Sequence, residues 1–117
     1  MTTELIVGFE VDGYHRWPNA PKQYEEFGQR HRHIFKFICW YPTGNSGDPA
    51  RRDKELWELR QEARQMVIAG YGIGIENSDP VEFEDMSCEG IADWLKMKMG
   101  FSKVFCAEEY WLGAIVS

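Results

Sequence analysis

The sequence predicts an α+β fold in which a four-stranded antiparallel sheet carries two helices on one face. Two runs near the N-terminus alternate apolar and polar residues, which is the period of a strand with one buried face. Two later segments repeat apolar residues every three or four positions, which is typical of amphipathic helices. The order strand, strand, helix, helix, strand, strand then favours helices packed on one side of an antiparallel sheet.

The two N-terminal strands are predicted over residues 3–14 and 31–41, and both place their odd-numbered side chains on the buried face. His15 extends this face at the end of the first strand, and two further histidines open it in the second. The odd positions are Leu5, Val7, Phe9, Val11, Gly13 and His15 in the first run, and His31, His33, Phe35, Phe37 and Cys39 in the second.

The connection between these strands, residues 16–30, is longer than an ordinary hairpin loop and contains Pro18 and Pro21, which interrupt strand pairing. It also carries aromatic residues, including Trp17. These side chains could shield a pocket above the histidines or simply anchor the loop to the core, and the sequence leaves both readings open.

The remaining elements follow from periodicity and capping. A turn-rich connection over residues 42–50 leads to a helix over 52–69, whose apolar stripe Trp57 widens. The glycine-rich segment 70–74 predicts a loop or a short strand. Ser87 is the expected N-cap of a second helix over 88–99 that ends at Gly100. Final strands are expected over residues 101–109 and 114–116.

The three histidines are the only ones in the chain, and strand parity can bring them together. His31 and His33 lie two residues apart, about 7 Å along one face of a strand. If the two strands are antiparallel neighbours, His15 at the end of the first lies opposite the start of the second. Three imidazoles with a position left for water are typical of a catalytic zinc site. A polar cluster or a proton-binding site remains the alternative.

Composition limits the function classes. The 117 residues are expected to form one domain, and the net charge of −6 argues against binding a nucleic-acid polymer. Cys39, Cys88 and Cys106 are widely spaced and form no C-x-x-C pair, so neither a disulfide framework nor a thiolate cluster is expected. No apolar stretch reaches the length of a membrane span. We therefore expect a cytoplasmic protein.

The order of these features resembles that of the 6-pyruvoyl- and 6-carboxy-tetrahydropterin synthases, members of the tunnelling fold. The matching positions are His15, the pair His31 and His33, the segment Met86-Ser-Cys-Glu-Gly-Ile-Ala-Asp-Trp-Leu95, and Glu108. The resemblance implies that the histidines bind zinc. It also implies that Glu108, or its neighbour Glu109, anchors a pterin or purine ring, with Glu89 as a further ligand-binding candidate. Trp17 is another such candidate because of its place in the loop above the histidines. Family members assemble into rings, so a homo-oligomer is implied too.

The departures from the family concern catalysis. Its enzymes have a catalytic cysteine between the first histidine and the pair, and an Asp-His couple after the first helix. Here residues 16–30 contain no cysteine, and residues 68–76 contain neither aspartate nor histidine. Three hypotheses remain open. They are a divergent zinc-dependent lyase, a non-catalytic pterin- or nucleotide-binding protein, for example a phage protein that sequesters a nucleotide signal, and a structural ring-former.

Overall fold

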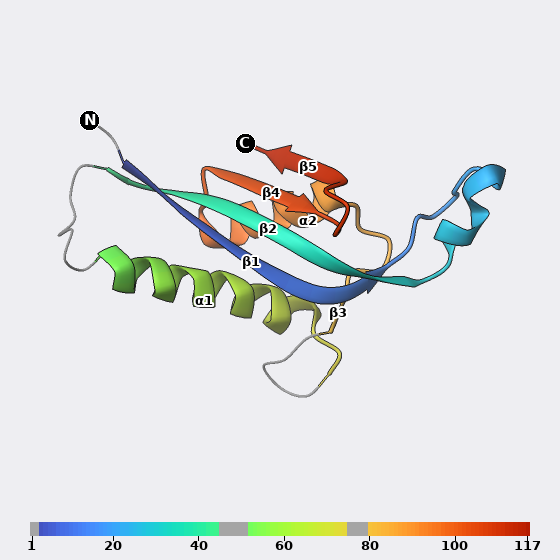
Figure 1. Cartoon of the computed structure of the whole chain (residues 1–117), viewed down its shortest axis with the longest axis horizontal. Coiled ribbons are helices and arrows are strands. Elements are labelled where there is room, and N and C mark those ends of the chain that lie inside the picture. Colours follow the sequence, from blue (N-terminus) through green and yellow to red (C-terminus); the bar gives the residue numbers. More distant parts are fainter. Residues whose placement is uncertain (1–2, 45–51, 75–79) are drawn as a thin grey trace.

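A computed structural model of the chain describes residues 3–44, 52–74 and 80–117. Its sheet has the strand order β3-β1-β2-β4-β5 (Figure 1). Two α-helices and one 3-10 helix accompany it within these described ranges. The bounds are β1 Thr3–His15, η1 Lys22–Gly28, β2 His31–Gly44, α1 Arg52–Tyr71, β3 Val81–Glu82, α2 Cys88–Met99, β4 Lys103–Ala107 and β5 Gly113–Val116.

The α+β class is confirmed, but the prediction of four antiparallel strands is wrong. The sheet has five strands and is mixed, because β3 pairs with β1 in parallel at Gly13↔Val81 and Tyr14↔Glu82. Two residues are too few to show a period, so β3 left no signal in the sequence. The connection over residues 16–30 contains η1, and the predicted turn over residues 42–50 lies largely outside the described residues.

The core lies between the inner face of the sheet and both α-helices. The odd-numbered residues of β1 and β2 supply that face, as their alternation predicts, and Phe9 stacks on Phe37 across the β1–β2 pair at 4.8 Å between ring centroids. The fully buried large side chains are Phe35, Phe37, Phe83, Ile91, Leu95, Val11, Val67, Val81, Val104, Cys39 and Cys106.

The ends of α2 follow its sequence. The Ser87 hydroxyl accepts a hydrogen bond from the backbone N–H of Gly90 at 3.1 Å, and Gly100 ends the helix with a φ of 71°. In α1 one expectation is wrong, because the side chain of Trp57 is 60% exposed and does not widen the buried stripe. No helix in the described part of the chain is long and apolar enough to cross a membrane.

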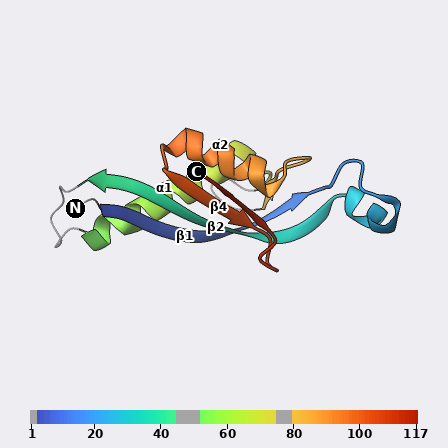
Figure 2. The same cartoon turned by 90° about the horizontal axis from the view of Figure 1, so that it is seen from above.

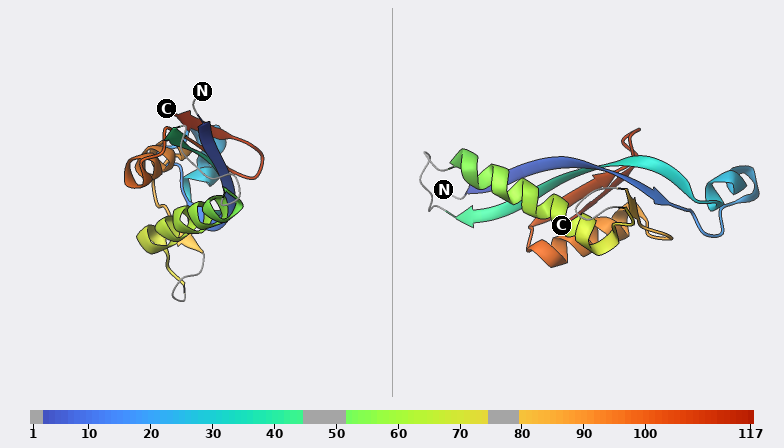
Figure 3. Two further views of the ribbon diagram at one scale, coloured as in Figure 1. Left: turned by 90° about the vertical axis from the view of Figure 1, so that its left-hand side faces the viewer. Right: turned by 90° about the horizontal axis from the view of Figure 1, so that it is seen from below.

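The paired strands β1 and β2 form a long twisted ribbon, and its end at η1 projects beyond both α-helices (Figures 1, 2 and 3). The radius of gyration is 15.6 Å, whereas a compact chain of this length has about 13 Å. The projecting end therefore has less helix cover than the rest of the sheet. It is also the end that carries the three histidines.

Candidate metal centre

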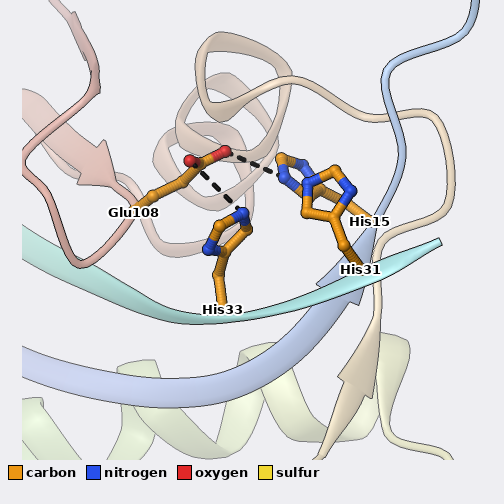
Figure 4. A group of neighbouring side chains, drawn as sticks. All are labelled: His15, His31, His33 and Glu108. Atoms are coloured by element: carbon orange, nitrogen blue, oxygen red, sulfur yellow. Dashed lines mark ion pairs between the residues drawn. The ribbon is translucent and has the colours of Figure 1, made fainter. Parts of the chain in front are cut away.

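The β1–β2 register brings the three histidines together. His15 pairs directly with His31, and Gly13 pairs with His33. All three imidazoles therefore project from the same face of the ribbon, and His33 is only two residues along β2 from the residue opposite His15. The ring centroids lie 4.6 Å apart for His15 and His31, 4.7 Å for His31 and His33, and 5.4 Å for His15 and His33. Figure 4 shows the rings converging on one point.

In each histidine Nδ1 faces an oxygen outside the cluster. Nδ1 of His31 lies 2.9 Å from the carbonyl oxygen of Gln29, and Nδ1 of His33 lies 2.9 Å from Oε1 of Glu109. Nδ1 of His15 lies 3.5 Å from the carbonyl oxygen of Met86. Because these acceptors call for a proton on Nδ1, they favour the tautomer that leaves the Nε2 lone pair free to bind a metal.

Glu108 brings a carboxylate to the same point. Its Oε1 lies 2.9 Å from Nε2 of His15, and its Oε2 lies 3.4 Å from Nε2 of His33 (Figure 4). Nε2 of His15 is buried, and no hydrogen bond of acceptable geometry satisfies it. A buried nitrogen that lacks a well-aligned hydrogen bond, beside a carboxylate and two further imidazoles, suits a cation that all of them bind.

The four residues His15, His31, His33 and Glu108 could therefore hold a metal ion, because one ligand atom from each lies within 4.8 Å of all the others. The sequence analysis expected three protein ligands and an open position. The geometry adds a fourth candidate, and four protein ligands are typical of closed zinc sites.

Glu109 contacts His33 at Nδ1, on the side of the ring away from Glu108. The pairing of β2 with β4 ends at Lys36↔Ala107. Two residues further along the same register, Glu109 would lie opposite Ile34. At that position the Glu109 side chain replaces the backbone acceptor, because its Oε2 accepts the N–H of Ile34 while its Oε1 faces Nδ1 of His33. Glu109 thus positions both the imidazole of His33 and the backbone of β2 at Ile34.

Sequence reasoning expected that only one of Glu108 and Glu109 could face the site, since neighbouring residues of a strand point apart. Glu108 alone of the two lines the cavity, but the reason is not strand alternation, because β4 ends at Ala107 and both glutamates lie in the turn before β5. The turn is closed by backbone hydrogen bonds between Glu108 and Leu112 and between Trp111 and Glu108. Both carboxylates consequently reach the histidines, one from each side of His33.

The proximity of these groups shifts their protonation. Burial lowers the pKa of His15, but the nearby Glu108 carboxylate outweighs it, and the net pKa lies above the ordinary 6.5. The same contact holds the pKa of Glu108 below 4.5, with further help from the charge on His33. Without metal, the site therefore favours a protonated His15 beside an ionised Glu108.

A cavity of about 570 Å³ opens on the histidines. Its walls combine aromatic side chains of the loop and η1 with the β4–β5 turn and the start of α2. Trp17 stacks against Tyr24 at 5.9 Å, and Phe27 meets the edge of His31 at 5.9 Å. The lining residues are His15, Arg16, Trp17, Pro18, Tyr24, Phe27, His31, His33, Asp85, Met86, Ser87, Cys88, Glu108, Tyr110 and Leu112.

Of the remaining candidates from the sequence, Trp17 lines the cavity, whereas Glu89 is exposed in the first turn of α2 and is not among the lining residues. Sequence reasoning missed Cys88, which lines the cavity and contacts Cys106. The thiol of Cys106 lowers the pKa of Cys88 by hydrogen bonding to it. A parity signal existed, since Cys88 belongs to the inner stripe of α2 and Cys106 to the inner face of β4.

Comparison with protein-family models and with curated proteins finds no match for this chain. The geometry of the site therefore carries the functional assignment.

Proposed function

We propose that the protein binds one zinc ion through His15, His31, His33 and Glu108, and holds a planar pterin- or purine-like ligand in the cavity beside it. The observation that carries the proposal is that one ligand atom from each of the four residues lies within 4.8 Å of the others, while Nδ1 of each histidine faces an oxygen outside the cluster. Partners behind a ligating histidine are a regular feature of metal sites.

The donor set supports zinc in particular. Imidazole nitrogen and carboxylate oxygen are ligands that Zn²⁺ accepts readily in tetrahedral geometry. Ca²⁺ and Mg²⁺ prefer sites built from oxygen atoms. A site with three nitrogen donors and one carboxylate therefore favours zinc over these ions.

The walls of the cavity support a flat ligand. Trp17, Tyr24 and Phe27 are each more than 40% exposed, although together they offer a large apolar surface. Tyr110 and Leu112 are also well exposed on the opposite wall. Aromatic side chains of this kind stack on heterocyclic rings, which gives the exposed surface a use.

Glu108 has two candidate roles that exclude each other. As a metal ligand it directs its oxygens at the cluster. As the anchor of a 2-amino-pyrimidinone edge, the role implied by the resemblance, it would need both oxygens for the ring's N–H groups. We propose that Glu108 binds the metal while the cavity is empty, and that a bound ring competes for it.

Binding without turnover is favoured over lyase activity by the polar groups of the cavity. While Glu108 is a ligand, four protein ligands leave a tetrahedral ion no position for a reacting water. Asp85 is paired with Arg16, and the Cys88 thiol lies 3.8 Å from the carbonyl oxygen of Leu112. Lyase activity of the kind that the resemblance implies would require one of these groups to be released as a base.

The test is the zinc content of the purified protein, followed by thermal unfolding of the zinc-loaded protein with pterins and guanine compounds. We expect one zinc per chain, and none retained by His33→Gln. Arg32→Gln is the matched control, because Arg32 neighbours His33 on β2 but pairs with Asp12 outside the cluster. Absence of zinc from the wild type would overturn the metal site, and no stabilisation by any compound would overturn the ligand class.

Self-association is a further part of the proposal. Ile6, Ile34 and Ile115 are 43–58% exposed on the sheet face opposite the helices, and such a face is often covered by a partner. The free edge of β1 is less available, because Arg60 donates to the carbonyl oxygen of Gly8 at 2.8 Å and Arg64 to that of Glu10 at 3.2 Å. A molar mass equal to one chain in light scattering would overturn this part.

A further inference from the structure

The charged groups around the cavity bear on the class of ligand. Among the described residues that line the cavity, Arg16 is the only arginine or lysine, whereas Asp85 and Glu108 are acidic. A phosphate chain is usually bound by several cationic groups or backbone N–H donors. The described lining therefore lacks the side chains that hold a phosphate chain.

Arg16 is already paired with a carboxylate. Its guanidinium forms an ion pair with both oxygens of Asp85, through Nε and Nη2. Glu84 and Glu82 also lie close enough to raise its pKa further. A phosphate group approaching Arg16 would have to displace Asp85 and then remain beside two more carboxylates.

Arg30, at the other end of the same loop, does not fill this gap. Its Nε donates to Oε1 of Glu82 at 2.5 Å, and its guanidinium lies over the ring of Tyr14 at 3.6 Å. It is not among the residues that line the cavity. The net charge of −6 adds a long-range repulsion of polyanions.

We propose that the cavity selects a planar heterocycle without a phosphate chain, such as a free base, a nucleoside or a dephosphorylated pterin, and that the Arg16–Asp85 pair enforces this selection. The proposal rests on the proposed function, since it names the ligand class of the same site. The aromatic walls bind the ring, and the Asp85 carboxylate, with Glu82 and Glu84 near Arg16, repels the polyphosphate.

The test is isothermal titration of the zinc-loaded protein with guanosine and with guanosine triphosphate, at equal ionic strength and with the zinc content checked afterwards. We expect the triphosphate to bind at least about tenfold more weakly than the nucleoside. Screening predicts that this ratio shrinks as salt is added. Equal or tighter binding of the triphosphate, or binding of neither compound, would overturn the inference, whereas the ligand class of the proposed function falls only if pterins also fail to bind.

A substitution tests the role of the ion pair directly. Asp85→Asn removes the charge that neutralises Arg16, so we expect the affinity for the triphosphate to rise severalfold while that for guanosine changes little. The matched control is Asp12→Asn, because Asp12 forms the same kind of pair with Arg32 away from the cavity. An equal change in both variants, or no change in Asp85→Asn, would overturn the assignment to Arg16 and Asp85.

Discussion

The sheet has two unlike ends. The part backed by α1 and α2 buries a dry apolar core, in which Phe37, Leu95 and Val104 are at most 1% exposed. The projecting end of the β1–β2 ribbon instead gathers three histidines, two glutamates and exposed aromatic residues around a cavity. One end is stabilised by apolar burial, and the other brings polar groups together that do not fully satisfy one another.

The contrast between the two ends of the sheet shows how the fold supports its site. The same two strands run through both ends, so the packing of their odd-numbered residues under the helices fixes the face from which the histidines emerge. A shift of one residue in register would turn the histidines of the shifted strand to the opposite face, and would so separate His15 on β1 from His31 and His33 on β2. The apolar end thus provides the alignment that the polar end uses.

The largest expected effect belongs to the core. Leu95→Ala removes a fully buried side chain from α2, and the cavity it leaves should lower the free energy of unfolding by about 2–5 kcal/mol. Met97→Ala on the same helix should change it by less than about 0.5 kcal/mol, because Met97 is 74% exposed. Urea unfolding measures both values, and similar losses in the two variants would contradict the tightly packed apolar core beneath α2.

The next effect belongs to the histidine end. Glu109→Gln keeps the side-chain shape but removes the charge behind His33, and the zinc affinity should fall by about 10- to 100-fold. Competition with a chromophoric chelator measures the affinity. Glu10→Gln is the control, since Glu10 pairs with Lys36 and is not part of the cluster. An unchanged affinity in Glu109→Gln would show that Glu109 does not position His33.

The pH dependence of stability should have opposite signs with and without metal. In the metal-free protein, His15 has a pKa raised above 6.5, so its contribution is complete below pH 6.5 and is lost as the pH rises through the raised pKa. Glu108 has a pKa lowered below 4.5, so its contribution is complete above pH 4.5 and is lost as the pH falls through the lowered value. Their joint contribution is therefore greatest between pH 4.5 and 6.5.

Zinc needs neutral imidazoles, so the stabilisation that it adds should instead grow as the pH rises above 6.5. Urea unfolding at fixed ionic strength, from pH 4 to 8 with zinc or with a chelator, separates the two curves. Parallel curves would contradict the arrangement of His15 and Glu108 around one ion.

The smallest expected change in stability is that of Trp17→Ala. Trp17 is 46% exposed and lines the cavity, so its loss should cost about 0.5 kcal/mol or less while weakening ligand binding severalfold. Trp57→Ala, which removes a similarly exposed tryptophan from α1, is the control for both measurements. A large loss of stability with unchanged binding would mean that Trp17 anchors the loop.

The elements and site residues that could be predicted from the sequence are those set by residues close together along the chain. Alternation in β1 and β2 predicted their buried face, and the register of that pair brings His15, His31 and His33 together as parity suggested. Ser87 and Gly100 marked the ends of α2 because capping chemistry is local.

The rest required long-range contacts. The two residues of β3 have no period of their own, and they pair with β1 only because the chain returns there after α1. The joint arrival of Glu108 and Glu109 depends on the strand ending at Ala107, whereas the sequence suggested a strand up to residue 109. Trp57 looked apolar enough for the core, but it lies on the outward side of α1.

The central claim is that one ion is shared by the Nε2 atoms of three histidines from two neighbouring strands. Anomalous diffraction at the zinc absorption edge, from crystals of the zinc-loaded protein, tests it most directly. The account predicts one peak per chain, about 2.0–2.1 Å from Nε2 of His15, His31 and His33, with a carboxylate oxygen of Glu108 at a similar distance. A zinc-loaded crystal with no peak at this point, or with its peak bound by other residues, would contradict the claim.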